Sequence, residues 1–207
     1  HDEICDLSSI RTISLKQNTL KSTIPSCLLT LPELSSLLLS SNGLTGSLSL
    51  SSLNVSPLTY LDLSYNQING SIPSEIGGFS SLCYLSFYSN AFSGHLPSEL
   101  GTLSVLSYLS VRSNHLDGPV PRTIGSMVNL QKLYVRSNKI TGTISSELFE
   151  LSKLILFDAT SNGLTGTIPT RIGVMKSLTS FAAAYNSQAG TVPAEIGLLS
   201  NIKCLYL

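Results

Sequence analysis

The sequence predicts an elongated solenoid of stacked coils, each made of a short β-strand, a turn and an irregular or 3₁₀ return. Asparagine recurs every 24 residues without an insertion, and the residues three and five positions before each asparagine are apolar. Glycine stands four positions after seven of the eight asparagines. The column of asparagines consists of Asn18, Asn42, Asn66, Asn90, Asn114, Asn138, Asn162 and Asn186.

The strand is predicted from the alternation of apolar and polar residues before each asparagine, as in LDLSYNQINGSIPSEIG at residues 61–77. Leu61 and Leu63 share one face of such a segment, because side chains of a strand alternate with a period of two. Strands of successive coils would pair about 4.8 Å apart in a parallel sheet. One coil buries too little apolar surface to order its own backbone, so the coils are expected to fold only as an array.

The return is predicted from the residues after the asparagine. In the coil of Asn66, Gly70 suits a tight corner with positive φ, and Pro73 fixes φ at the start of a helical turn. Ile76 and Phe79 then supply the apolar side of a short 3₁₀ segment that returns the chain. Asparagine tolerates the left-handed conformation, and its amide bonds nearby backbone, so we expect the column to satisfy backbone groups at the strand exit.

Composition excludes several classes of function. Charged residues make up 12% of the chain, and 12 basic residues balance 12 acidic ones, which argues against nucleic acid or an anionic membrane as partner. No apolar run approaches the roughly 20 residues that span a bilayer, so direct membrane insertion within these residues is not expected. The four cysteines lack the close spacing of zinc sites, and no metal or cofactor is expected.

An enzyme is also not expected. His95 and His115 fall in predicted turns, where they are interpreted as solvated side chains, and no nucleophile with a base or pair of carboxylates accompanies them. Two Asn-x-Ser sequons, at Asn54 and Asn69, are candidate glycosylation sites and favour an extracellular or cell-surface location.

The repeat, LxxLxLxxNxLxGxIPxxIGxLxxL, closely resembles the plant-type leucine-rich repeat of receptor-like kinases, receptor-like proteins and polygalacturonase-inhibiting proteins. The Gly-x-Ile-Pro element distinguishes this subclass, as at Gly70 to Pro73 and Gly166 to Pro169. The resemblance implies an α/β repeat fold, a right-handed curved solenoid with a parallel β-sheet on the concave face and 3₁₀ or irregular returns on the convex face. Some coils depart from the pattern: Ser145 replaces proline, and Gln188 replaces an apolar residue.

Residues 1–207 are interpreted as a single solenoid of eight coils plus the start of a ninth, with both caps incomplete. We therefore expect a segment of a longer protein. Cys5 stands where the resembling families place the second cysteine of an amino-terminal cap. Cys27 follows 22 residues later, almost one coil, so a bridge between them is conceivable but stays open. Cys83 is expected as a buried free thiol.

In the resembling families the exposed strand face binds ligands, and here it carries residues of types enriched at binding hot spots. Tyr60, Tyr84 and Tyr108 recur in one position of three successive coils and should form a ladder. Tyr88, Arg112 and Arg136 form a second column. The predicted ligand-binding residues are Tyr60, Asp62, Tyr84, Tyr88, Tyr108, Arg112, Lys132, Tyr134, Arg136 and Asp158. Alternatively, stacked tyrosines only reinforce the neighbouring strands.

The predicted function is extracellular recognition of a protein or peptide by a receptor-like ectodomain fragment. One alternative is a secreted inhibitor of cell-wall-degrading enzymes. Another is an ice-binding solenoid, because Thr23, Thr143, Thr167 and Thr191 share one phase of the turn side. Ser47, Ser71, His95 and Pro119 interrupt that column.

Overall fold

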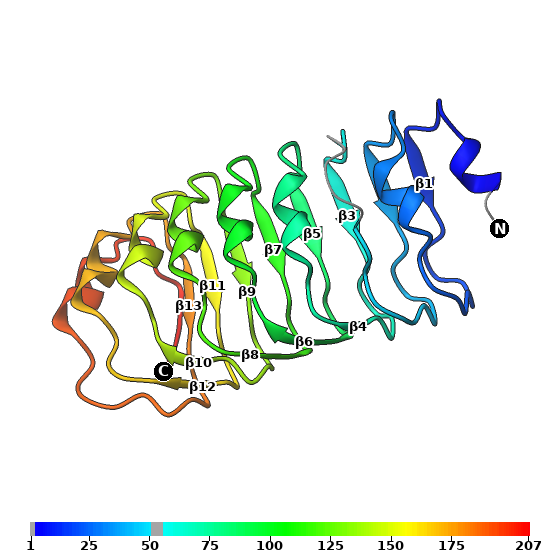
Figure 1. Ribbon diagram of the computed structural model, residues 1–207. Coiled ribbons are helices and arrows are strands. Elements are labelled where there is room, and N and C mark those ends of the chain that lie inside the picture. The colour runs from blue at the N-terminus through cyan, green and yellow to red at the C-terminus, as the bar shows by residue number, and fades with distance from the viewer. Residues whose placement is uncertain (1–2, 51–55) are drawn as a thin grey trace.

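The computed structural model describes residues 3–50 and 56–207, and Figure 1 shows coils stacked side by side from the N-terminus to the C-terminus. We number the coils 1 to 8 by their asparagines, from Asn18 to Asn186. Positions within a coil are counted from that asparagine, so that Tyr60 is at position −6 of coil 3. No helix in the described ranges is long and apolar enough to cross a membrane.

The inner sheet is a nine-stranded parallel sheet with one strand from each coil and one from the start of a ninth. Pairing joins residues 24 apart, for example Tyr60 with Tyr84 and Tyr84 with Tyr108, so each position forms a straight column across the sheet. Its strands are β1 Thr12–Ser14, β2 Ser36–Leu38, β3 Tyr60–Asp62, β5 Tyr84–Ser86, β7 Tyr108–Ser110, β9 Lys132–Tyr134, β11 Leu156–Asp158, β13 Ser180–Ala182 and β14 Cys204–Tyr206.

Short 3₁₀ helices return the chain on the opposite side of the coils, as the proline pattern predicted. Pro73 directly precedes η3, and the N–H of Phe79 donates to the carbonyl of Ile76 to close it. The helices are η1 Glu3–Asp6, η2 Ser26–Thr30, η3 Ser74–Gly78, η4 Ser98–Thr102, η5 Arg122–Ser126, η6 Ser146–Glu150, η7 Thr170–Val174 and η8 Ala194–Leu198.

The segment between the asparagine and the proline is more regular than predicted. Several coils add a second short strand there, which pairs in parallel with its neighbours. These turn-side strands are β4 Asn69–Gly70, β6 Ala91–His95, β8 His115–Asp117, β10 Thr141–Thr143 and β12 Gly163–Thr165. The sequence predicted only a turn here, and these strands form in addition because stacking aligns equivalent backbone groups closely enough to pair.

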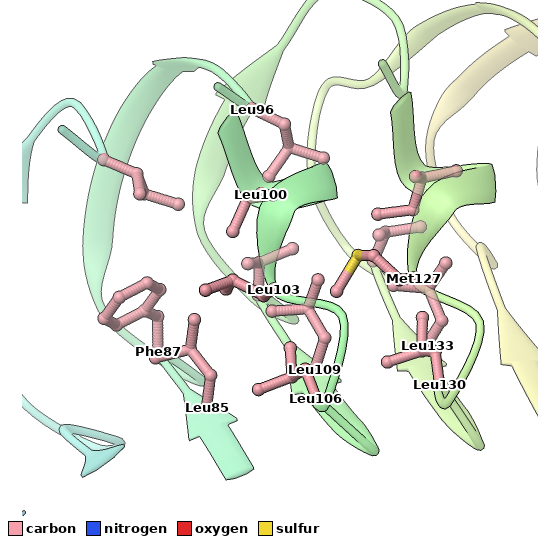
Figure 2. Close-up of a cluster of buried hydrophobic side chains, with 14 of the residues drawn as sticks. Leu85, Phe87, Leu96, Leu100, Leu103, Leu106, Leu109, Met127, Leu130 and Leu133 are labelled. Carbon is pink, nitrogen blue, oxygen red and sulfur yellow. The ribbon is translucent and has the colours of Figure 1, made fainter. Parts of the chain in front are cut away.

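One apolar core fills the space between the inner sheet and the 3₁₀ helices. Figure 2 shows Leu85 and Leu109 from the sheet side packing toward Leu100 and Leu103 of the return, and all four are fully buried. The same positions are apolar in the neighbouring coils, so the core continues along the stack. Coils therefore depend on their neighbours for burial, which explains the long unbroken array.

The asparagine column holds the strand exits together. The side-chain amide of Asn114 donates to the carbonyls of Val111 and Arg112 in its own coil and to that of Phe87 in the preceding coil, at 3.0, 3.2 and 2.9 Å. Its side-chain oxygen accepts the N–H of Phe92 at 3.0 Å. The pattern recurs from Asn42 to Asn186, so each of these asparagines fastens two coils.

Asparagine tolerates the left-handed conformation, but it is not the left-handed residue of these turns. The left-handed residue is the one just before it, such as Ser113 at φ 55° or Tyr185 at φ 56°. The asparagine must reach back to carbonyls two and three residues earlier, so the preceding residue makes the turn. The glycines at position +4 do have positive φ, for example Gly70 at 77°.

The cysteines resolve the alternative left open at the N-terminal end. Cys5 and Cys27 form a disulfide with Cα atoms 5.6 Å apart, which links η1 to η2. Cys83 is exposed, so the expectation of a buried thiol was wrong. Its position, −7, lies one residue before β5, outside the apolar alternation that fills the core.

The 3₁₀ helices of neighbouring coils do not pack equally closely along the whole stack. A Cβ added at Gly101 would lie 2.4 Å from the carbonyl oxygen of Thr123 in the next coil, so glycine permits tight stacking there. In coil 6 the equivalent residue is Phe149, which is buried, and η6 contacts η7 less than η4 contacts η5. The 3₁₀ helices η6 and η7 therefore pack less closely than their neighbours, while the strands of the same coils stay paired.

Candidate ligand-binding surface

The ten predicted binding residues lie on five adjacent strands of the inner sheet, or just after them. Positions −6, −4 and −2 of coils 3 to 7 carry all of them, and the registered pairing brings them onto one continuous face. Their role in ligand binding stays a prediction. Their geometry separates them into four groups: a tyrosine stack, a set of buried polar residues, a set of cations and the lining of a hollow.

The tyrosine stack comprises Tyr60, Tyr84 and Tyr108. Ring centroids are 4.0 Å apart for the first pair and 4.3 Å for the second, with interplanar angles of 2° and 9°, so the predicted ladder forms. Burial between its neighbours raises the pKa of the Tyr84 phenol, and the adjacent tyrosines raise it further. The ring faces cover one another, so the stack offers mainly edges and hydroxyl groups to a ligand.

Two further tyrosines extend this aromatic surface. Tyr134 tilts against Tyr108 with centroids 5.5 Å apart, and burial raises its pKa. Tyr88 meets Tyr65 edge to face at 4.6 Å, and the guanidinium of Arg112 lies over the Tyr88 ring at 5.0 Å. Arg112 is thus held by a cation–π contact that does not use its terminal N–H groups as donors.

Side chains at position −4 point to the same face as those at −6, but several of them are less exposed to solvent than this alternation predicts. Asp62 is only 6% exposed, and Ser86 and Ser110 in the same column are also buried. The Asp62 carboxylate accepts the Oγ–H of Ser64 at 2.6 Å and lies 3.7 Å from the ammonium of Lys16. The expectation that Asp62 is exposed was wrong, because neighbouring side chains cover it and satisfy its carboxylate. Its role in ligand binding stays a prediction.

The predicted cations of the face are, in contrast, unpaired. Within the described residues Arg112, Lys132 and Arg136 make no salt bridge, whereas Lys16, Arg11, Arg122 and Arg171 do. The Nε atoms of Arg112 and Arg136 are buried, and neither has a hydrogen-bond partner. Because these atoms are covered, a ligand would meet the terminal N–H groups of the two guanidinium ions instead.

A hollow of about 350 Å³ lies beyond these cations, over coils 6 to 8 and the strand of coil 9. Its floor is low because serine and alanine occupy positions that hold tyrosine or arginine elsewhere. The lining consists of Tyr134, Arg136, Leu156, Asp158, Thr160, Ser180, Ala182, Ala184, Tyr185 and Tyr206. Seven of these residues were not among the predicted binding residues. The small residues of coil 8 were visible in the sequence, but only the walls around them show that they form a hollow.

Asp158 on the floor of this hollow has fewer partners than Asp62 at the same position. Its carboxylate accepts the N–H of Thr160 at 3.1 Å, just as Asp62 accepts that of Ser64. Among the described residues, its carboxylate has neither the serine hydroxyl nor the lysine ammonium that Asp62 has as partners. Asp158 is also more exposed than Asp62, and it lines the hollow.

Other predicted features lie away from this face. Asn69 is exposed in β4, while Asn54 lies outside the described residues, so glycosylation stays a prediction at both. His95 and His115 lie in turn-side strands rather than turns, and His95 pairs with Asp117. The described residues contain no cluster of three His, Cys, Asp or Glu side chains able to hold a metal ion.

The threonines of the turn side do not form a continuous column. Thr143 pairs with Thr165 between β10 and β12, and the Thr165 hydroxyl donates to the carbonyl of Gly142 at 3.2 Å. The imidazole of His95 and the ring of Pro119 interrupt the row at its middle. A flat, repeating hydroxyl surface is therefore limited to a few residues.

Fold and surface together define a curved repeat solenoid with an aromatic and cationic inner face. The family model described as Leucine Rich Repeat matches residues 57–79 and 129–151. A search of curated proteins found no match. Solved structures then identify the chain as a leucine-rich-repeat solenoid similar to plant receptor ectodomains.

One similar structure is the ectodomain of the membrane receptor kinase GASSHO1/SCHENGEN3 from Arabidopsis thaliana in complex with CASPARIAN STRIP INTEGRITY FACTOR 2. It has 35% identity and a TM-score of 0.94, over 98% of this chain and 24% of the receptor chain. A TDR receptor has 27% identity and a TM-score of 0.89, over 100% and 40% of the two chains.

A third similar structure is the Arabidopsis receptor kinase HAESA in complex with the peptide hormone IDA and the co-receptor SERK1. It has 28% identity and a TM-score of 0.82, over 99% of this chain and 38% of that chain. The chain thus spans between about a quarter and two fifths of the length of these receptor chains. The similarity covers the repeat array itself.

Proposed function

We propose that this chain is a peptide-recognition segment of a larger receptor-like protein at the cell surface, and that it binds its ligand on the inner sheet. The observation that carries the proposal is one continuous face. Along the stack of coils it presents first ring edges, then cations without salt bridges, and then a hollow. The scaffold beneath that face is rigid, because every coil from 2 to 8 is fastened to its predecessor by an asparagine.

The dimensions of the face suit an extended peptide better than a small molecule. Four strand spacings separate Tyr88 in coil 4 from Ala184 in coil 8, a distance of about 19 Å at the strand spacing of a sheet. An extended chain covers that distance with about six residues. A side chain pointing toward the sheet would enter the hollow, while the backbone crossed the cations of coils 5 and 6.

The similar structures support the same proposal. The GASSHO1/SCHENGEN3 structure is a receptor ectodomain, and HAESA is in complex with a peptide hormone. Extracellular location follows by the same analogy and agrees with the sequon at the exposed Asn69. Recognition needs no catalytic group in this mechanism, because the repeats supply only binding and positioning.

The proposal is tested by selecting peptides from a displayed random library against the purified chain. Selected peptides are then titrated against a Ser180→Tyr variant, which places a large ring in the hollow at position −6, the position of Tyr84. Peptide affinity should fall at least tenfold, while far-UV circular dichroism and the melting temperature stay close to those of the wild type.

A matched control carries the same substitution on a different face. Ser104→Tyr places tyrosine on the exposed convex side of coil 4 and should leave peptide affinity within twofold. If selected peptides bound equally well to wild type and Ser180→Tyr, the inner face would not be their site. Strong binding of an intact cell-wall-degrading enzyme, with no peptide selected, would favour the inhibitor alternative, and thermal hysteresis would favour the ice-binding one.

A further inference from the structure

The charge of the inner face differs from that of the chain as a whole. The strand-face positions −6, −4, −2 and −1 of coils 1 to 8 carry four basic and two acidic residues, although the whole chain is balanced. Lys16 and Asp62 neutralise each other. The remaining basic residues, Arg112, Lys132 and Arg136, face a single acidic side chain, Asp158, so the central part of the face has a net positive charge.

Two of these cations, Arg112 and Arg136, lie side by side in adjacent coils and form a cation cluster. Arg112 and Arg136 are both at position −2, and the N–H of Ser113 donates to the carbonyl of Arg136 at 2.9 Å, so their backbones are direct neighbours. Like charges on side chains of neighbouring strands repel each other, which makes an anion near both favourable. Lys132 is exposed and lies four residues before Arg136 in the same coil, about 13 Å away along the extended backbone.

The hydrogen-bond inventory points the same way. Both arginines have a buried Nε–H without an acceptor, and Thr160 and Ser180 in the hollow have hydroxyl groups with no side-chain hydrogen bond among the described residues. The guanidinium groups carry only donors, so they need acceptors from a ligand or from water. Guanidinium groups bind carboxylates through paired, charge-assisted hydrogen bonds, which are among the strongest in proteins.

The hollow begins where the cation cluster ends. Arg136 belongs to both, and Leu156, Ala182 and Ala184 give the hollow an apolar floor. Its volume of about 350 Å³ is sufficient for one large apolar or aromatic side chain. The two subsites lie within one or two strand spacings of each other, which is the reach of neighbouring residues in an extended peptide.

We infer that the ligand is an acidic peptide segment in which a carboxylate side chain binds the Arg112 and Arg136 guanidinium groups and a nearby apolar side chain fills the hollow. The inference rests on the proposed peptide-binding function and adds the chemistry of the ligand. Arg112, stacked on Tyr88, and Arg136, at the rim of the hollow, are the specificity-determining residues. The tyrosine stack stiffens the sheet beside them.

The test uses the same displayed library of random peptides and a double variant, Arg112→Gln with Arg136→Gln. The matched control, Arg122→Gln with Arg171→Gln, removes the same charge from the 3₁₀ side, where both arginines are exposed in surface salt bridges. Circular dichroism and melting temperature verify that both variants fold. A selected peptide is also synthesised with Asn or Gln in place of its Asp or Glu.

Wild type should select peptides enriched in Asp or Glu next to a large apolar residue. Their affinity should fall at least 30-fold on the Arg112→Gln, Arg136→Gln variant and stay within twofold on the control. The amide peptide should bind wild type weakly and bind both proteins equally, because the carboxylate and the two arginines form one interaction. Affinity for wild type should decrease with added salt more steeply than affinity for the double variant.

The outcomes separate this inference from the proposed function. Peptides that lose affinity on Ser180→Tyr but show no acidic enrichment, or bind the arginine variant normally, would overturn the inference and leave peptide recognition standing. Selected peptides insensitive to every inner-face variant would overturn both. An equal loss on the arginine variant and its control would show a general charge effect and would also overturn the assignment to Arg112 and Arg136.

Discussion

Coils 3 to 5 and coils 7 to 8 share one backbone design but present opposite surfaces. In the first region, Tyr60, Tyr84 and Tyr108 stand in one column and cover each other's rings. In the second, Leu156 and Ser180 continue that column and leave a hollow above the sheet. Aromatic residues therefore do not by themselves make an open surface in a repeat array, since stacked rings cover one another.

The largest effect should come from the scaffold, and it should be the same in both regions. The two variants are Asn114→Ala, in the coil of Tyr108, and Asn162→Ala, in a coil that lines the hollow. Each removes four hydrogen bonds and leaves backbone groups without a partner. Each should lower the free energy of unfolding by roughly 3 kcal/mol, measured by urea denaturation.

Asn18 provides the control for this prediction. It is exposed and bonds only two carbonyls of its own coil, so Asn18→Ala should cost less than about 1 kcal/mol. If Asn114→Ala and Asn162→Ala differed strongly, the two regions would differ in their scaffold as well as in their surface, and the comparison would need revision.

A smaller effect should distinguish the two regions. Tyr84→Ala removes two stacked pairs and should lower the free energy of unfolding by about 1–3 kcal/mol. Ser180→Tyr makes the reverse change in the hollow and should alter stability by less than about 1 kcal/mol, because the added ring enters open space. Thermal unfolding measures both.

The order of the two variants should be reversed for peptide affinity. Ser180→Tyr should abolish most of the affinity of selected peptides, and Tyr84→Ala should reduce it only modestly. A Tyr84→Ala variant that kept full stability but lost all peptide binding would show that the stack contacts the ligand directly, contrary to its geometry.

The smallest effect concerns pH and is confined to the stack. Burial raises the pKa of Tyr84 in the folded state above the ordinary value of about 10. Below pH 9 both folded and unfolded chains keep this phenol protonated, so stability should not depend on it. Above about pH 10 the unfolded chain loses the proton first, and stability should decrease as pH rises.

Absorbance at 295 nm during alkaline titration measures this order. Tyr84→Phe should remove the part of the curve that rises at the highest pH. Titration of all tyrosines at one pH would contradict the protected position assigned to Tyr84.

The sequence by itself determined the repeat, the strand positions, the 3₁₀ returns after proline, the asparagine column and the alignment of Tyr60, Tyr84 and Tyr108. These features follow from local patterns repeated at a fixed period, and a period places equivalent residues in register wherever coils stack. Tertiary structure decided the turn-side strands, the Cys5–Cys27 bridge, the burial of Asp62, the exposure of Cys83 and the hollow. These depend on which side chains of neighbouring coils meet across the stack, and distance and packing between coils are set by the whole array rather than by any one repeat.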